Sequence, residues 1–192
     1  MKLIAFAAST NSRSINKQLV TYATRLLVSD AIDGVADVSV ETIDLNDFEM
    51  SIYSEDREAA NGVPQQGHDF VAAIGAADAA LISFAEHNGF YTAAYKNIFD
   101  WASRINQRVY QGTPAVLLST SVGGRGGQNV LQTATMSGQF FGYEVLSSLS
   151  IPSFHDNFDV VAGRLSNPDL DTQLRTSLQA LGTVVAAGST EA

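Results

Sequence analysis

The amino-acid sequence predicts a layered α/β fold in which helices cover a parallel sheet. Short continuous apolar runs alternate along the chain with longer segments in which apolar residues recur every three or four positions. A continuous apolar run is typical of a strand buried on both faces, and the longer spacing is typical of an amphipathic helix. Regular alternation of the two patterns favours parallel strands joined by helical crossovers.

Five segments are predicted to be strands. Four of them are wholly or largely apolar: residues 3–7, 79–84, 115–119 and 145–151. The fifth, residues 38–43, alternates apolar and polar side chains, which is typical of a strand nearer the edge of a sheet.

The clearest helix prediction is at the end of the chain. Asn167 is a suitable N-cap and Pro168 suits the first helical position. The apolar face that follows consists of Leu170, Leu174, Leu178, Leu181 and Val185. The other four helices are predicted from the following sets: Ile15, Leu19, Ala23, Leu26 and Leu27; Phe70, Val71, Ile74 and Ala77; Tyr95, Ile98, Phe99 and Ala102; and Val130, Leu131, Ala134 and Phe141.

The chain length and the absence of cysteine narrow the possible classes of protein. A chain of 192 residues is predicted to form one domain, residues 1–192, with a core that needs no covalent staples. Because there is no cysteine, thiol catalysis, CxxC redox chemistry and thiolate-bound clusters are excluded. Any redox chemistry must therefore come from a bound cofactor.

The charge and hydropathy patterns exclude further classes. The net charge is −9 and only three residues are lysine, so we expect neither a nucleic-acid partner nor an anionic membrane partner. No apolar run is long enough for a membrane span or a signal-peptide core, and we therefore expect a cytoplasmic protein. The three histidines are scattered, so no metal site is predicted.

Two stretches depart from the alternating pattern. Residues 46–63 form a long polar connection, and residues 152–166 form a second one. Long connections are often functional, but both stretches also fit ordinary surface loops with no function of their own.

Three loops that follow predicted strands are rich in groups that bind ligands. The first loop, residues 8–16, contains four hydroxyls, two amides and one guanidinium, and it leads into a helix N-terminus. Backbone N–H groups and the positive end of the helix dipole favour a phosphate there. Helix capping alone would need only one or two of these residues.

The second and third loops suit a flat heteroaromatic ring. The second loop, residues 85–91, places polar side chains and a glycine beside aromatic residues. The third loop, residues 119–127, has glycine at positions 123, 124, 126 and 127, so its backbone can approach a ligand closely. Neither a Walker loop nor a GxSxG elbow is present.

Together these loops resemble the NADPH-dependent FMN reductase family, a flavodoxin-like group that includes quinone, azo-dye and chromate reductases. The family's first loop reads Gly-Ser-x-Arg-x-x-Ser-x-Asn, and here Ser9, Ser14 and Asn16 match it, whereas Ala8 replaces the glycine and Asn11 the arginine. The second loop, Glu86-His87-Asn88-Gly89, is similar to the family's Glu-Tyr-Asn-Gly. The most specific match is Lys96-Asn97-Ile98-Phe99-Asp100-Trp101, and the third loop lacks only the family's proline.

The resemblance implies a flavodoxin-like, doubly wound sheet of five parallel strands in the order 2-1-3-4-5, with helices on both faces. It also implies a homodimer or homotetramer that binds FMN and uses NADPH or NADH as co-substrate. The residues implied to bind FMN are Ser9, Asn11, Arg13, Ser14, Ile15 and Asn16 at the phosphate and Glu86, His87, Asn88, Gly89, Ser121, Gly123 and Gly124 around the ring.

The implied reaction is ping-pong hydride transfer from NAD(P)H to FMN and then to a small acceptor such as a quinone, flavin, azo compound or metal oxyanion. No catalytic side chain is predicted, because the cofactor carries the chemistry. Backbone N–H groups of Gly123 and Gly124 are expected to stabilise the reduced ring.

Two other functions remain open at this stage. A flavodoxin-like electron carrier would bind FMN but take electrons from a partner protein. A binding module that has lost flavin affinity would fit the changes at Ala8 and Asn11.

Overall fold

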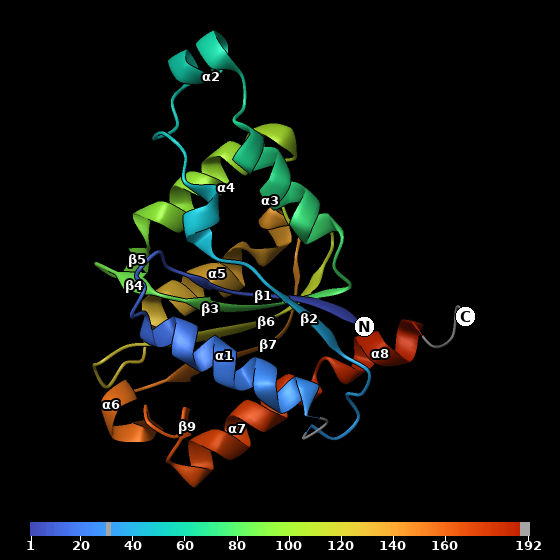
Figure 1. The fold of residues 1–192 in the computed structure, drawn as a ribbon, viewed down its shortest axis with the longest axis vertical. Helices are drawn as coiled ribbons and strands as arrows, with labels where there is room; N and C mark the ends of the chain where they lie inside the picture. Colours follow the sequence, from blue (N-terminus) through green and yellow to red (C-terminus); the bar gives the residue numbers. More distant parts are fainter. Residues whose placement is uncertain (30–31, 189–192) are drawn as a thin grey trace.

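Five parallel strands form the central sheet, and their order is β2-β1-β3-β6-β7 (Figure 1). In the computed structural model, which describes residues 1–29 and 32–188, these strands are β1 (Lys2–Ala8), β2 (Ser39–Thr42), β3 (Ala79–Phe84), β6 (Pro114–Thr120) and β7 (Glu144–Ile151). Every neighbouring pair is parallel. The structure thus confirms the predicted strands, their order and the edge position of β2.

Helices cover both faces of the sheet (Figure 1). One face packs against α1 (Ile15–Val28) and α7 (Pro168–Gln179), and the other packs against α3 (Gln65–Gly75), α4 (Ala93–Ile105) and α5 (Gln128–Phe141). Side chains of β1 alternate between the two layers. Leu3 and Ala5 are buried on the α1 side, and Ile4 and Phe6 are buried on the opposite side. The sheet is therefore apolar on both faces, as a doubly wound fold requires.

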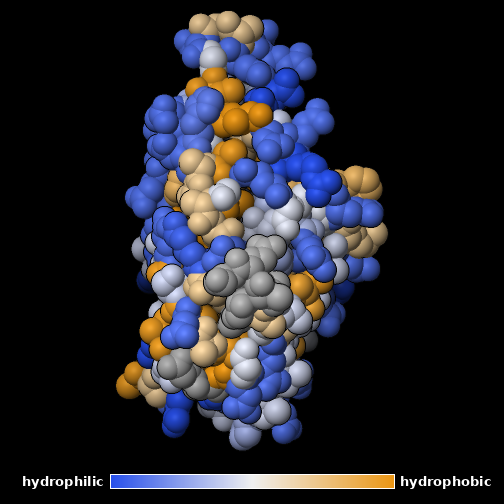
Figure 2. Space-filling view, turned by 90° about the vertical axis from the view of Figure 1, so that its right-hand side faces the viewer, coloured by the Kyte–Doolittle hydropathy of each residue, from blue (hydrophilic) through white to orange (hydrophobic). Residues whose placement is uncertain are grey.

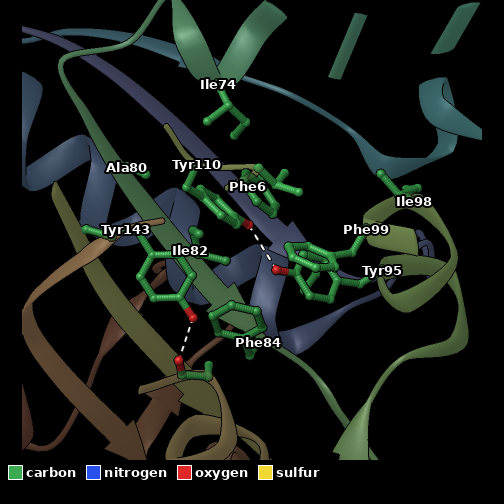
Figure 3. Close-up of a cluster of buried hydrophobic side chains, with 14 of the residues drawn as sticks. Phe6, Ile74, Ala80, Ile82, Phe84, Tyr95, Ile98, Phe99, Tyr110 and Tyr143 are labelled. Carbon is green, nitrogen blue, oxygen red and sulfur yellow. Dashed lines mark hydrogen bonds between the residues drawn. The ribbon is translucent and has the colours of Figure 1, made fainter. Parts of the chain in front are cut away.

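Buried tyrosines join α4 and α5 to the sheet layer (Figure 3). The hydroxyls of Tyr95 and Tyr110 lie 2.9 Å apart, and the Tyr143 hydroxyl donates to the carbonyl of Ala134 at 2.5 Å. Burial raises the pKa of Tyr95 and of Tyr110 well above the ordinary value for a phenol. The cluster is therefore neutral at physiological pH and serves packing.

The C-terminal helical segment differs from its prediction in one respect. Asn167 caps α7 as expected, since its side-chain oxygen accepts from the N–H groups of Asp169 and Leu170. The helix ends at Gln179, however, and a separate helix, α8 (Gly182–Gly188), follows. A Cβ atom at Gly182 would lie 2.8 Å from the carbonyl oxygen of Gly34, so this close contact requires glycine. The predicted face that ran on to Val185 is therefore divided between two helices.

The two long connections contain short elements of their own. Residues 46–63 contain most of a 3₁₀ helix, η1 (Leu45–Phe48), and the whole of α2 (Glu55–Asn61), which projects from the body in Figures 1 and 2. Residues 152–166 contain α6 (Phe154–Asn157) and an antiparallel pair, β8 (Phe158–Asp159) and β9 (Arg164–Leu165). Among the residues described, no helix is long and apolar enough to cross a membrane.

Candidate functional site

The three ligand-type loops meet at the carboxyl edge of the sheet, where hydrogen bonds between distant segments hold them together. Thr92, the N-cap of α4, donates through its hydroxyl to the carbonyl of Ala8 at 2.9 Å. This bond ties the end of the second loop to the start of the first. Thr92 was not predicted as a site residue, although a threonine just before a helix is a recognisable capping signal.

Asn16 joins the first loop to the ends of β3 and β6. Its side-chain oxygen accepts from the Ser83 hydroxyl at 2.8 Å and from the Thr120 N–H at 3.0 Å. Its amide nitrogen donates to the Thr120 carbonyl at 3.1 Å. The residue is only 2% exposed, and its side chain holds the ends of the strands that surround the site.

The first loop folds through local hydrogen bonds that leave other donors free. The Ser9 hydroxyl accepts from the N–H of Asn11 at 3.2 Å, and the Asn11 side chain accepts from the N–H of Arg13 at 2.9 Å. Ser14 caps α1 by accepting from the N–H of Lys17 at 3.3 Å. These turns leave the side chains of Asn11 and Arg13 exposed on the outer surface of the loop.

The donors that remain suit an anion. Within the described residues, the N–H groups of Thr10 and Ser12 donate to no protein acceptor. The first turn of α1, which starts at the half-buried Ile15, contains no acidic residue. The Arg13 guanidinium has no ion-pair or hydrogen-bond partner in the described part of the chain. Such an arrangement of donors is typical of a phosphate site at a helix N-terminus.

The second loop is a β-hairpin formed by β4 (Glu86–His87) and β5 (Phe90–Tyr91). Its turn residues, Asn88 and Gly89, have φ values of 53° and 78°, as the type I′ turn of a two-residue hairpin requires. His87 is exposed, and Phe90 is 47% exposed, so the tip of the hairpin presents polar and aromatic groups to solvent.

Glu86 contributes a structural contact rather than a free carboxylate. Its Oε2 atom accepts from the N–H of Val130 at 3.0 Å, in the first turn of α5. The residue before that helix is Gly127, which provides no side-chain cap. Glu86 therefore satisfies an N-terminal donor of α5 and fixes the hairpin beside the third loop.

The third loop contains glycines of two kinds. A Cβ atom at Gly126 would lie 2.3 Å from the Ser150 hydroxyl, and Gly127 has a φ of 78°, so packing and backbone geometry account for both. At Gly123 and Gly124 a Cβ atom would have no neighbour within 4 Å. Their N–H groups donate to no protein acceptor among the described residues, whereas Ser121 donates to the Gly123 carbonyl at 3.3 Å.

Arg125 and Asn129 lie at the site but are not among the residues that the resemblance implies to bind FMN. The Arg125 guanidinium donates to the Asn129 side-chain oxygen at 2.7 Å. The Asn129 amide nitrogen would lie 3.4 Å from a Cβ atom placed at Gly89, so it borders the hairpin turn. The contact brings a positive charge toward the junction of the second and third loops.

An ion pair lies behind the first loop. The Lys17 ammonium contacts the Asp44 carboxylate, and this hydrogen bond together with those from Asn46 lowers the pKa of Asp44. Asn46 also donates to the carbonyl of Thr10 at 3.1 Å. The chain after β2 is thereby attached to the first loop.

The Lys-Asn-x-x-Asp-Trp motif on α4 anchors the long connection after β2. Asn97 accepts from the N–H of Tyr53 at 2.9 Å and donates to the carbonyl of Met50 at 3.0 Å. The indole of Trp101 donates to the Ser51 carbonyl at 2.7 Å and meets the Tyr53 ring edge to face. The motif therefore positions residues 50–53. Among the described residues, no group of side chains has the composition of a metal site.

Comparison with known proteins identifies the family of this chain. The NADPH-dependent FMN reductase model matches residues 1–156. The NAD(P)H-dependent FMN reductase PA1204 of Pseudomonas aeruginosa is 28% identical over 183 residues, which are 94% of this chain and 93% of that protein. A 2-hydroxy-1,4-benzoquinone reductase of a Burkholderia species is 32% identical over 127 residues, 66% of this chain and 63% of that protein.

The fold is likewise similar to a solved flavoenzyme. FerB, an NAD(P)H:(acceptor) oxidoreductase of Paracoccus denitrificans, superposes with a TM-score of 0.71 at 20% identity, covering 97% of each chain. At this identity the likeness concerns the fold alone. The sequence match over residues 1–156 decides the family: the chain belongs to the NADPH-dependent FMN reductases and is an enzyme that uses FMN to oxidise NAD(P)H.

Proposed function

We propose that FMN binds across the three loops, with its phosphate on the first loop and its ring between the second and third. The observation that carries this placement is the open space at Gly123 and Gly124, where nothing within the protein requires glycine. A backbone with free N–H groups and no side chains can approach a planar ring closely.

The phosphate is assigned to donors that the protein leaves unused. Ser9, Asn11, Arg13 and Ser14 surround the N-terminus of α1, and the N–H of Ile15 is in its first turn. The exposed Arg13 side chain supplies the charge that an arginine at position 11 would otherwise bring. The side chain of Asn16 supports the site indirectly, because its amide group already bonds to Ser83 and Thr120.

FMN held by these loops would supply the hydride chemistry, taking two electrons from NAD(P)H and delivering them to a second substrate. The chain's own groups bind and orient the ring: the hairpin at 86–89 borders it on one side and residues 121–124 on the other. The N–H groups of Gly123 and Gly124 compensate negative charge on the ring. No protein acid or base is assigned a role.

We further propose small oxidised acceptors such as quinones as the second substrate, in line with the benzoquinone reductase relative. We place this activity in the cytoplasm, where the reduced nicotinamide cofactors are available.

We also propose that the chain forms a homodimer or homotetramer. Helix α2 buries none of its residues, and a seven-residue helix is too short to be stable in isolation. Beside it, Ile52 is 66% exposed at the rim of a cavity of about 270 Å³, whose lining includes Leu45, Phe48 and Ile98. A second copy would cover this apolar surface.

An absorbance spectrum of the protein with FMN, recorded before and after anaerobic addition of NADPH or NADH, tests this proposal. We expect flavin absorbance that bleaches rapidly. Bound flavin that does not bleach would indicate an electron carrier instead.

A matched pair of arginine variants tests the phosphate placement. Arg13→Gln should weaken FMN binding about tenfold, equal to roughly 1.4 kcal/mol, and leave riboflavin binding unchanged. Arg108→Gln is the matched control. Arg108 is exposed, and its backbone packs against Gly142 at the end of α5. Loss of its charge should affect the binding of neither ligand. Equal losses for FMN and riboflavin would contradict the assignment.

A further inference from the structure

A groove of about 200 Å³ begins at the first loop and follows the exposed side of α1. One wall carries Ser12, Ser14 and Thr21, and Arg25 lies at the far end. The opposite wall carries Phe158 and Val160 from the β8–β9 segment. The helical rise gives a path of roughly 16 Å from Ser14 to Arg25.

The apolar wall of the groove is held in place by several contacts. Phe158 is 4% exposed, stacks on Phe154 at 4.6 Å between ring centroids, and meets Tyr22 edge to face. The Asp159 carboxylate accepts from the N–H groups of Val161 and Ala162, each at 2.9 Å, which fixes the connection between β8 and β9. The groove is therefore preorganised.

Arg25 lies at the far end of the groove. Its guanidinium contacts the carbonyl of Gly163 and lies 5.7 Å from the centre of the Tyr22 ring. This contact joins the β8–β9 segment directly to α1. The groove thus has a defined length between the first loop and Arg25.

The chemistry of the walls matches a nucleoside. A flat heterocycle can lie against Val160, which is 54% exposed beside the edge of the buried Phe158, while hydroxyl and amide groups on α1 can bond to a ribose. The start of the groove shares Ser14 with the proposed phosphate site. A nucleoside joined to that phosphate could therefore enter the groove directly from the first loop, with no helix or strand of the described chain in its path.

We infer that the groove receives the adenylate half of FAD, so that this chain binds FAD as well as FMN. The inference rests on the proposed placement of the flavin phosphate at the first loop. In FAD the adenylate is joined to that same phosphate, and Lys17, which is ion-paired with Asp44, lines the groove together with Ser14. The adenosine of a nicotinamide dinucleotide has no such link to the first loop.

The test compares FMN and FAD binding to the full chain after removal of flavin. For the unaltered chain we expect the two dissociation constants to agree within about tenfold. Thr21→Glu places a carboxylate in the groove, and it should weaken FAD binding by about tenfold or more. FMN binding should change little, because the first loop is roughly 10 Å away, where exposed charges are screened.

Thr24→Glu is the matched control, since it adds the same charge to the same helix outside the groove. It should leave both flavins unaffected, and thermal melts should show that both variants fold. FAD binding more than about a hundredfold weaker than FMN binding in the unaltered chain would overturn the inference. So would equal losses of both flavins in Thr21→Glu.

Two further outcomes distinguish failure of the FAD inference from failure of the proposed phosphate placement at the first loop. A raised KM for NADPH in Thr21→Glu, with FAD binding unchanged, would assign the groove to the nicotinamide dinucleotide and overturn the inference alone. Failure of the unaltered chain to bind either flavin would overturn the placement at the first loop, and the inference with it.

Discussion

The carboxylate of Glu86 accepts a hydrogen bond from the backbone N–H of Val130 at 3.0 Å, across 44 positions of the chain. This contact joins the hairpin of the second loop to the N-terminus of α5. Gly127, at the N-cap, has no side chain to do so. The geometry of the proposed ring site thus depends on the stability of one helix end.

Shortening Glu86 should therefore loosen both the helix and the site. We expect Glu86→Ala to reduce the free energy of unfolding by about 1 kcal/mol, as loss of a helix cap does, and to weaken FMN binding. Glu86→Gln retains an accepting oxygen and should lose less than half as much. Urea unfolding and flavin titration measure the two effects. Weak FMN binding in Glu86→Gln with normal stability would mean that the carboxylate itself contacts the flavin.

Removal of the Asn16 side chain should cost stability more than any other change in the first loop. Asn16→Ala leaves the buried Ser83 hydroxyl and the Thr120 N–H without their shared acceptor. We expect a loss of about 3 kcal/mol in the free energy of unfolding. Ser83→Ala removes only one of these bonds and should cost about 1 kcal/mol. Unchanged stability in Asn16→Ala together with lost FMN binding would instead make Asn16 a direct phosphate ligand.

The Lys17–Asp44 pair predicts a specific pH dependence of stability. The pKa of Asp44 is lowered in the folded protein, chiefly by the hydrogen bond from Lys17. The pair therefore adds stability that is fully present above the unfolded pKa of aspartate, about 3.9, and is lost as pH falls through the folded pKa. Both side chains are more than a third exposed, so we expect less than about 1 kcal/mol.

Urea unfolding of the unaltered chain and of Asp44→Asn, at pH 7 and at pH 3, measures this contribution. Asparagine can still accept from the N–H of Asn46, so the turn after β2 is preserved. The difference between the two proteins should shrink in acid. A difference that grows at pH 3 would show that the carboxylate is not stabilised in the fold.

Trp101 should control how readily a protease cleaves the projecting connection, residues 46–63. Trp101→Phe keeps an aromatic ring against Tyr53 but loses the hydrogen bond from the indole to the Ser51 carbonyl. A loss of about 1 kcal/mol of local stability corresponds to roughly fivefold faster trypsin cleavage after Arg57 in α2. Lys96→Gln disrupts only an exposed ion pair on the same helix and should not change that rate. Equal rates in all three proteins would mean that other contacts hold the connection.

The strands, most of the helices and the three ligand-type loops could be read from the sequence, because each depends on a local pattern. Apolar runs become strands when both faces are covered, and Asn167 caps a helix whose start lies within three residues of it. The end of that helix was predicted less well. Gly182, which starts the next helix, packs against the backbone of Gly34, a residue distant in the sequence.

The sequence by itself determined the residue types that gather at the carboxyl edge of the sheet, since parallel strands bring their loops to one edge. Only the tertiary structure decided which of them remain available to a ligand. Asn16 and Glu86 match the family pattern, yet their polar atoms bond to residues up to 104 positions away. Gly123 and Gly124 stay open, whereas Gly126 is confined by β7. The physical reason is that hydrogen bonding and packing are settled by neighbours in space, which local sequence patterns do not specify.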